Sequence, residues 1–87
     1  MAGPNPFIVR QHQSFAISNL ADDVSVKFIT ENGMIVRQIL KDNILGSQVI
    51  WDGKNDAGEY VSSGIYLFVI YNEETGMNRV GKVAVIH

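Results

Sequence analysis

Hydrophobic and polar residues alternate along most of the chain, which is the pattern of β-strands with one buried face. Val24, Val26 and Phe28 fall on one side of such a strand. Four other segments alternate in a similar way: 15–18, 34–40, 48–51 and 79–86. No stretch follows the 3.6-residue period of a helix, so the pattern predicts an all-β protein.

The segment 65–72 is the strongest predicted strand. Tyr66 and Phe68 alternate with Leu67 and Val69, so both of its rows are apolar. Such a strand is expected at the centre of a sheet that is covered on both faces.

The orientation of the segment 34–40 stays open. Either Met34, Val36 and Leu40 face the core, or Ile35 and Ile39 do. Alternation alone does not separate these two registers, because both rows contain apolar side chains.

Turn signals separate the predicted strands at intervals of about 8–12 residues. Asn32-Gly33 favours a tight hairpin, 73–76 forms a second hairpin turn, 41–47 is a polar loop, and 52–64 is rich in turn residues. This organisation predicts an antiparallel β-sandwich of the immunoglobulin or fibronectin-III type with about seven strands. We expect residues 1–87 to form one domain, with 1–6 as a linker or expression remnant.

Composition narrows the function classes. The chain is 46% hydrophobic and 18% charged with a net charge of −2, which argues against intrinsic disorder. Its seven Lys and Arg residues are scattered, so we expect no nucleic-acid binding, and the absence of cysteine excludes disulfides and thiolate sites. The longest apolar run, 65–71, is far shorter than the roughly 20 residues of a membrane helix, so no membrane insertion is expected. The first four residues do not read as a signal peptide, which suggests a module of a longer chain or another export route.

The residues that could support catalysis are few. A nucleophilic triad needs a base, and the two histidines are His12, between two glutamines, and His87, at the end of the sequence. The acidic pairs 22–23 and 73–74 fall in predicted turns, where solvated charges are the simpler interpretation. We therefore predict no enzyme activity, no catalytic residue and no cofactor.

The segment 52–59 superficially resembles a calcium-binding loop. Its register is wrong, because Lys54 and Ala57 occupy the third and sixth positions and no glutamate follows at the twelfth. Asp and Asn also stabilise turns by accepting hydrogen bonds from backbone N–H groups. We predict no metal site, with Asp52 and Asp56 as weak candidates only.

The roles of several aromatic and branched residues, in ligand binding or in packing, stay open at this point. Trp51 is either a stacking platform for a ligand or a core residue, and the second is more common for a single Trp in a strand. A carbohydrate- or protein-binding module would use Trp51, Tyr60 or Tyr71. Ile29, Ile50 and Tyr71 form either an exposed partner patch or a surface covered by a neighbouring domain.

The order of motifs resembles a known family. Trp51-Asp52-Gly53-Lys54-Asn55-Asp56-x-Gly58 is followed by Val61-x-Ser63-Gly64-Ile65-Tyr66, with Pro4-Asn5-Pro6-Phe7 before them and Gly81-Lys82-Val83 after them. Across essentially the whole chain, this order resembles the immunoglobulin-like domain of flagellar hook-capping proteins. It is also similar to the related C-terminal sorting domain of type IX secretion substrates.

The resemblance implies a non-catalytic C-terminal module of a larger exported bacterial protein, located outside the cell or at its surface. Such a module serves export, surface attachment or domain packing, with an upstream domain, secretion machinery or cell-surface components as partners. The alternative that it implies is a hook-cap scaffold domain. Structural roles are implied for six motif residues: Trp51, Asp52, Gly53, Gly58, Gly64 and Tyr66. The chain departs from type IX tails in its final segment, which lacks their usual basic end.

Overall fold

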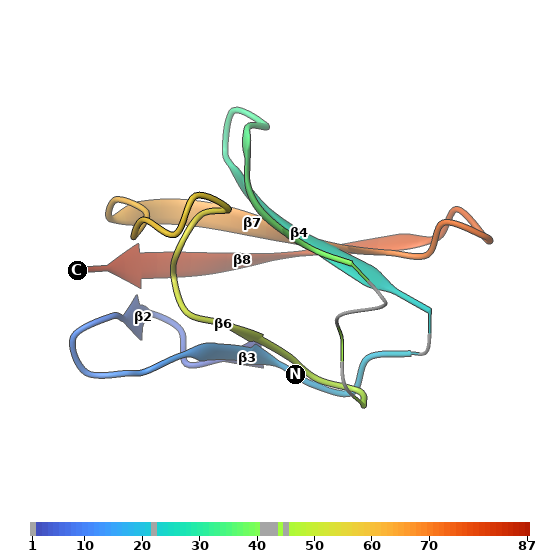
Figure 1. Ribbon diagram of the computed structural model, residues 1–87, viewed down its shortest axis with the longest axis horizontal. Coiled ribbons are helices and arrows are strands. Elements are labelled where there is room, and N and C mark those ends of the chain that lie inside the picture. The colour runs from blue at the N-terminus through green and yellow to red at the C-terminus, as the bar shows by residue number, and fades with distance from the viewer. Residues whose placement is uncertain (1, 22, 41–43, 45) are drawn as a thin grey trace.

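The computed structural model describes residues 2–21, 23–40, 44 and 46–87, and within them it contains two β-sheets and no helix (Figure 1). The described part therefore holds no helix that could span a membrane. The eight strands are β1 (Ala2–Gly3), β2 (Phe7–Ile8), β3 (Phe15–Ile17), β4 (Ser25–Thr30), β5 (Ile35–Ile39), β6 (Val49–Trp51), β7 (Gly64–Tyr71) and β8 (Asn78–Ile86).

The two sheets form the predicted sandwich. The smaller sheet has the strand order β1-β3-β6, and the larger one has the order β2-β8-β7-β4-β5. All pairings are antiparallel except that of β2 with β8. The all-β sandwich is confirmed, with eight strands instead of about seven.

Residues 2–6, expected from the sequence to be a linker, contribute to the sandwich. Ala2 pairs with Ile17 in the small sheet, and Phe7 begins β2 in the large sheet. Between them, the Asn5 side chain bonds to β8. Two-residue strands are too short to show an alternating pattern, which is why the sequence did not reveal them.

The core is built around stacked aromatic rings from both sheets. Trp51 of β6 stacks on Phe28 of β4 with 4.2 Å between ring centroids, and Phe15 of β3 meets Phe28 edge-on. The row of Val24, Val26 and Phe28 is buried as predicted. The loop expected over 41–47 falls partly on residues outside the described ranges.

β7 is the central strand of its sheet, but only one of its faces is fully covered. Tyr66 and Phe68 are buried, whereas Leu67 and Val69 on the other row are half-buried and Ile65 is exposed. The expectation of cover on both faces was therefore wrong.

Neither proposed register of β5 describes it fully. The pairing of β4 with β5 shifts between Phe28 and Ile29, which interrupts the alternation. As a result Val36 and Ile39, one from each proposed row, pack against the core, while Ile35 is 49% exposed.

Candidate functional site

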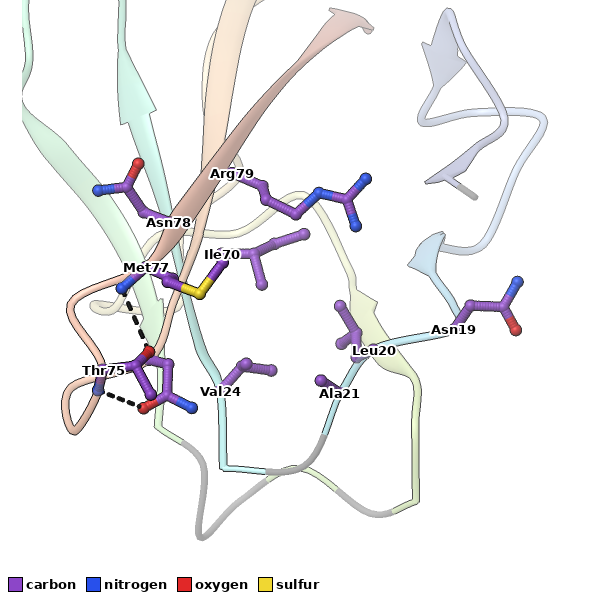
Figure 2. A pocket seen from close by; sticks show the side chains of 10 residues that line it. Asn19, Leu20, Ala21, Val24, Ile70, Thr75, Met77, Asn78 and Arg79 are labelled. Atoms are coloured by element: carbon purple, nitrogen blue, oxygen red, sulfur yellow. Dashed lines mark hydrogen bonds between the residues drawn. The ribbon is translucent and has the colours of Figure 1, made fainter.

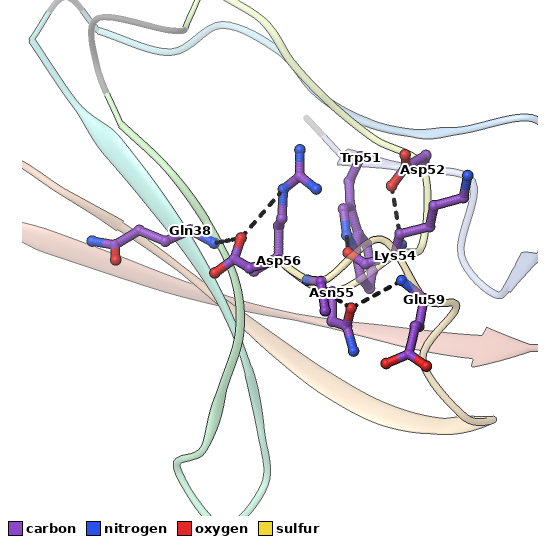
Figure 3. Close-up of polar contacts among 9 residues, drawn as sticks. Gln38, Trp51, Asp52, Lys54, Asn55, Asp56 and Glu59 are labelled. Carbon is purple, nitrogen blue, oxygen red and sulfur yellow. Dashed lines mark hydrogen bonds and ion pairs between the residues drawn. The ribbon is translucent and has the colours of Figure 1, made fainter.

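The motif loop, residues 52–60, is attached to the core through Trp51. This side chain is 1% exposed, and its Nε1–H donates a hydrogen bond to the Lys54 carbonyl at 2.9 Å (Figure 3). Gly53 has a φ of +81°, and a Cβ at this position would lie 3.2 Å from the Phe7 ring. The positive φ favours glycine there, and any larger residue would also have to displace the Phe7 ring slightly.

Side-chain oxygens hold the loop in a series of turns. Asp52 Oδ1 accepts a hydrogen bond from the Lys54 N–H at 3.0 Å. Asn55 Oδ1 accepts from the N–H groups of Ala57 and Glu59, both at 3.0 Å (Figure 3). These are the Asx turns that the spacing of Asp and Asn favours.

Asp56 connects this loop to the free side of β5. Its N–H donates to the Val36 carbonyl at 2.9 Å, and its Oδ1 accepts from the Gln38 N–H at 3.3 Å. The same Oδ1 lies 3.7 Å from Arg37 Nε, an ion pair between partly exposed groups. Asp56 thus binds β5 where another strand would otherwise pair.

The two weak metal candidates have separate structural contacts. Asp52 binds within its own turn, whereas Asp56 binds β5. Across the described residues, no group of three or more His, Cys, Asp or Glu side chains is placed to hold a metal ion.

The two histidines lie in different contacts. His12 Nδ1 accepts a hydrogen bond from the Ile8 N–H at 3.0 Å, within the turn that follows β2. His87 bonds to the Val61 carbonyl and meets the Tyr60 ring edge-on, with 5.9 Å between ring centroids. Each imidazole therefore supports the chain around it.

The three aromatic candidates for ligand binding do not converge. Trp51 is in the core, while Tyr60 is 55% exposed with Lys54 Nζ 5.0 Å from its ring centroid. Tyr71 ends β7, where its hydroxyl accepts a hydrogen bond from Gln38 Nε2 at 2.9 Å and its ring centroid lies 4.8 Å from Lys27 Nζ, so its neighbours differ from those of Tyr60. A shared aromatic platform is therefore not formed.

The apolar residues singled out as a partner patch lie on two different sheets. Ile29 and Tyr71 belong to the large sheet, whereas Ile50 belongs to β6 of the small sheet. On the outer face of the large sheet, Ile29 and Tyr71 share a half-buried row with Leu67 and Val69, two residues that sequence reasoning did not single out.

A second feature missed from the sequence is the incomplete edge of β8. β2 pairs with β8 only at Val85 and Ile86 (Figure 1). Just before this pairing, Asn5 Nδ2 donates to the Lys82 carbonyl at 2.9 Å and Asn5 Oδ1 accepts from the Ala84 N–H at 3.1 Å. In the described structure, no strand pairs with this side of β8 over residues 78–81.

A groove lies between this part of β8 and the end of the small sheet. It consists of two adjoining hollows with cavity volumes of about 250 and 300 Å³. Both are lined by Asn19, Leu20, Ile70 and Arg79. Figure 2 shows Leu20 facing Ile70 across the first hollow, with Arg79 above it.

Comparison with known proteins identifies the fold. The sequence matches no protein-family model and no curated protein. Among solved structures, the chain is similar to part of PorZ, described as an essential bacterial surface component of the type-IX secretion system of Porphyromonas gingivalis. The similarity has a TM-score of 0.82 at 24% sequence identity and covers 100% of this chain but 11% of PorZ. This chain thus has the fold of one domain-sized part of that much longer protein.

Proposed function

We propose that this chain is a non-catalytic module of a larger bacterial protein that is exported or held at the cell surface in connection with secretion. The observation that carries the proposal is the similarity of the entire chain to part of a surface component of a secretion system. The resemblance of the Trp51–Tyr66 motif to sorting domains, found independently from the sequence, supports the same class.

The contacts of the polar residues support a non-catalytic role. His12 accepts a backbone hydrogen bond, and Asp52 and Asp56 each bind backbone N–H groups. These side chains, which would be the natural candidates for acid, base or ligand roles, stabilise turns and a sheet edge instead.

The finer part of the proposal concerns export. In this view the domain is a C-terminal module that the secretion machinery or a cell-surface component recognises, and its other partner is the domain that precedes it.

The test is removal of the domain from its parent protein in the native bacterium. We expect the tagged parent to lose its surface location, measured by protease accessibility on intact cells, while the activity of the remaining protein in lysates is retained. As a matched control, the domain is replaced by an unrelated immunoglobulin-like domain of similar length, which should not restore the location. Normal surface delivery of the parent after deletion would refute the export role. If the unrelated domain restored the surface location, the domain would act only as a spacer and not as a recognised signal.

A further inference from the structure

The edge of β8 is only half covered. β8 has nine residues, and β2 and Asn5 together bind its C-terminal part, from Lys82 to Ile86. In the part of the chain that the structure describes, residues 78–81 have β7 as a partner on one side and no strand on the other.

The direction of the backbone groups on this edge follows from their neighbours. The Lys82 carbonyl, the Ala84 N–H and the Ile86 carbonyl all point away from β7, because they bond to Asn5 and Val9. Backbone groups alternate in direction along an antiparallel strand, so those of Val80 point the same way. Val80 is 61% exposed, and its N–H and carbonyl can pair with an added strand.

The groove supplies a place for a side chain of that added strand. Arg79 and Gly81 lie on the inner row of β8, opposite Ile70 and Phe68 of β7. Gly81 lies directly against the Phe68 ring, which helps to line the larger hollow. The hollow of about 300 Å³ is open to solvent on one side and partly polar, but its volume exceeds the roughly 150 Å³ of a cavity that holds benzene. It therefore has room for one large apolar side chain laid against Leu20, Phe68 and Ile70.

Charge selects among the possible occupants. The segment 78–82 carries Arg79 and Lys82 and no carboxylate, and no ion pair joins Arg79 to another described residue. Antiparallel pairing of two copies through this segment would place two Arg79 and two Lys82 side chains in one interface that has no carboxylate. A strand with a carboxylate opposite Arg79 would compensate the charge instead.

We propose that the open edge of β8 binds an extended, acidic peptide segment by strand addition. The segment pairs its backbone with Val80, places a Glu or Asp side chain opposite Arg79, and inserts an apolar side chain two residues away into the groove beside Gly81. This site does not depend on the export role, because the binding can be measured on the 87-residue chain by itself.

The test uses the synthetic peptide STETLTS, capped at both ends, in which glutamate and leucine fall on the same face of a strand. We expect backbone amide shifts in NMR titrations that centre on Val80 and Lys82, with a dissociation constant of about 1 mM or tighter. The peptide STKTLTS lacks the carboxylate, and the peptide STETSTS lacks the apolar side chain. Each should bind at least about fivefold more weakly than STETLTS.

Variants of the domain separate the backbone from the side-chain contribution. Val80→Pro removes the outward N–H at a position where an edge strand tolerates proline, and it should weaken binding of STETLTS at least about tenfold. Val80→Ala keeps the N–H and should bind like the original protein. Arg79→Glu should reverse the preference, so that STKTLTS binds more tightly than STETLTS.

Four results would overturn the proposal. Three concern the peptide: no amide shifts at about 5 mM peptide, equal binding by the Val80→Pro variant, and no change of preference in Arg79→Glu. The fourth is self-association that Val80→Pro abolishes, because it would identify a second copy as the occupant. Circular dichroism of each variant confirms that the sandwich is retained.

Discussion

The edges at β5 and β8 of the large sheet are treated in different ways. At β5, Asp56 reaches from the motif loop and binds both Val36 and Gln38. At β8, Asn5 plays a similar part by binding both Lys82 and Ala84. In each case one residue replaces a strand partner.

The difference lies in the length of strand that each residue must protect. β5 has five residues, and one residue is enough to occupy its middle. β8 has nine residues, so Asn5 and β2 leave its N-terminal part open. Exposed edges favour pairing with other chains, and proteins usually block them. The edge of β8 is blocked at its C-terminal end and open beside a groove at its N-terminal end. It is therefore a candidate site for pairing with a strand of another chain.

The largest effect is expected from Trp51→Ala, which removes the support of the loop that closes β5. Truncating this buried ring should cost about 3–5 kcal/mol of unfolding free energy, measured by guanidinium denaturation. Ile50→Ala, at the adjacent exposed position, should change stability by less than about 0.5 kcal/mol. A similar loss in both variants would contradict the role of Trp51 as the anchor.

A smaller effect is expected from Asn5→Ala, which lengthens the open edge of β8. The loss of two hydrogen bonds should cost about 1–2 kcal/mol in thermal or chemical unfolding. We also expect more self-association in sedimentation, because the groups of Lys82 and Ala84 become free to pair. Gln13→Ala, at another exposed position, serves as the control and should change neither property. If Asn5→Ala behaved like this control, Asn5 would not be the residue that protects β8.

The smallest effect is expected from Asp56→Ala, which weakens the cover of β5. The variant keeps the backbone bond to Val36 but loses the acceptor for the Gln38 N–H and an ion pair that is partly exposed to solvent. The expected cost is about 0.5–1.5 kcal/mol, together with faster hydrogen exchange at the Gln38 amide.

Asp56→Asn separates the hydrogen bond from the charge. This variant keeps a side-chain oxygen and should stay close to the original stability, because exposed ion pairs contribute little. If Asp56→Asn lost as much stability as Asp56→Ala, the ion pair with Arg37, and not the hydrogen bond from Gln38, would be the contact that holds the loop on β5.

Much of the fold could be predicted from the sequence. The buried row at Val24, Val26 and Phe28 follows from alternation, because side chains of a strand point to opposite faces in turn. The Asx turns at Asp52 and Asn55 follow from local geometry, since their oxygens bind N–H groups two to four residues ahead. The exclusion of disulfides rests on the absence of cysteine, and the prediction of no nucleic-acid binding rests on the scattered basic residues, so both come from the sequence alone.

Other features required the tertiary structure. The bulge in β5 depends on its partner strand, so neither predicted row of that segment was fully correct. Asn5 lies 77 and 79 residues from its partners Lys82 and Ala84, and no local pattern indicates such a contact.

The sequence by itself therefore determined the all-β class, the positions of most strands and the turn chemistry of the Trp51–Tyr66 motif, because these depend on alternation and on contacts between near neighbours. Only the tertiary structure decided which strand edges are closed, which apolar row is covered and where a groove remains. These properties depend on pairing between segments that are distant in the chain, and the free energy of such pairing is not encoded in any one of them.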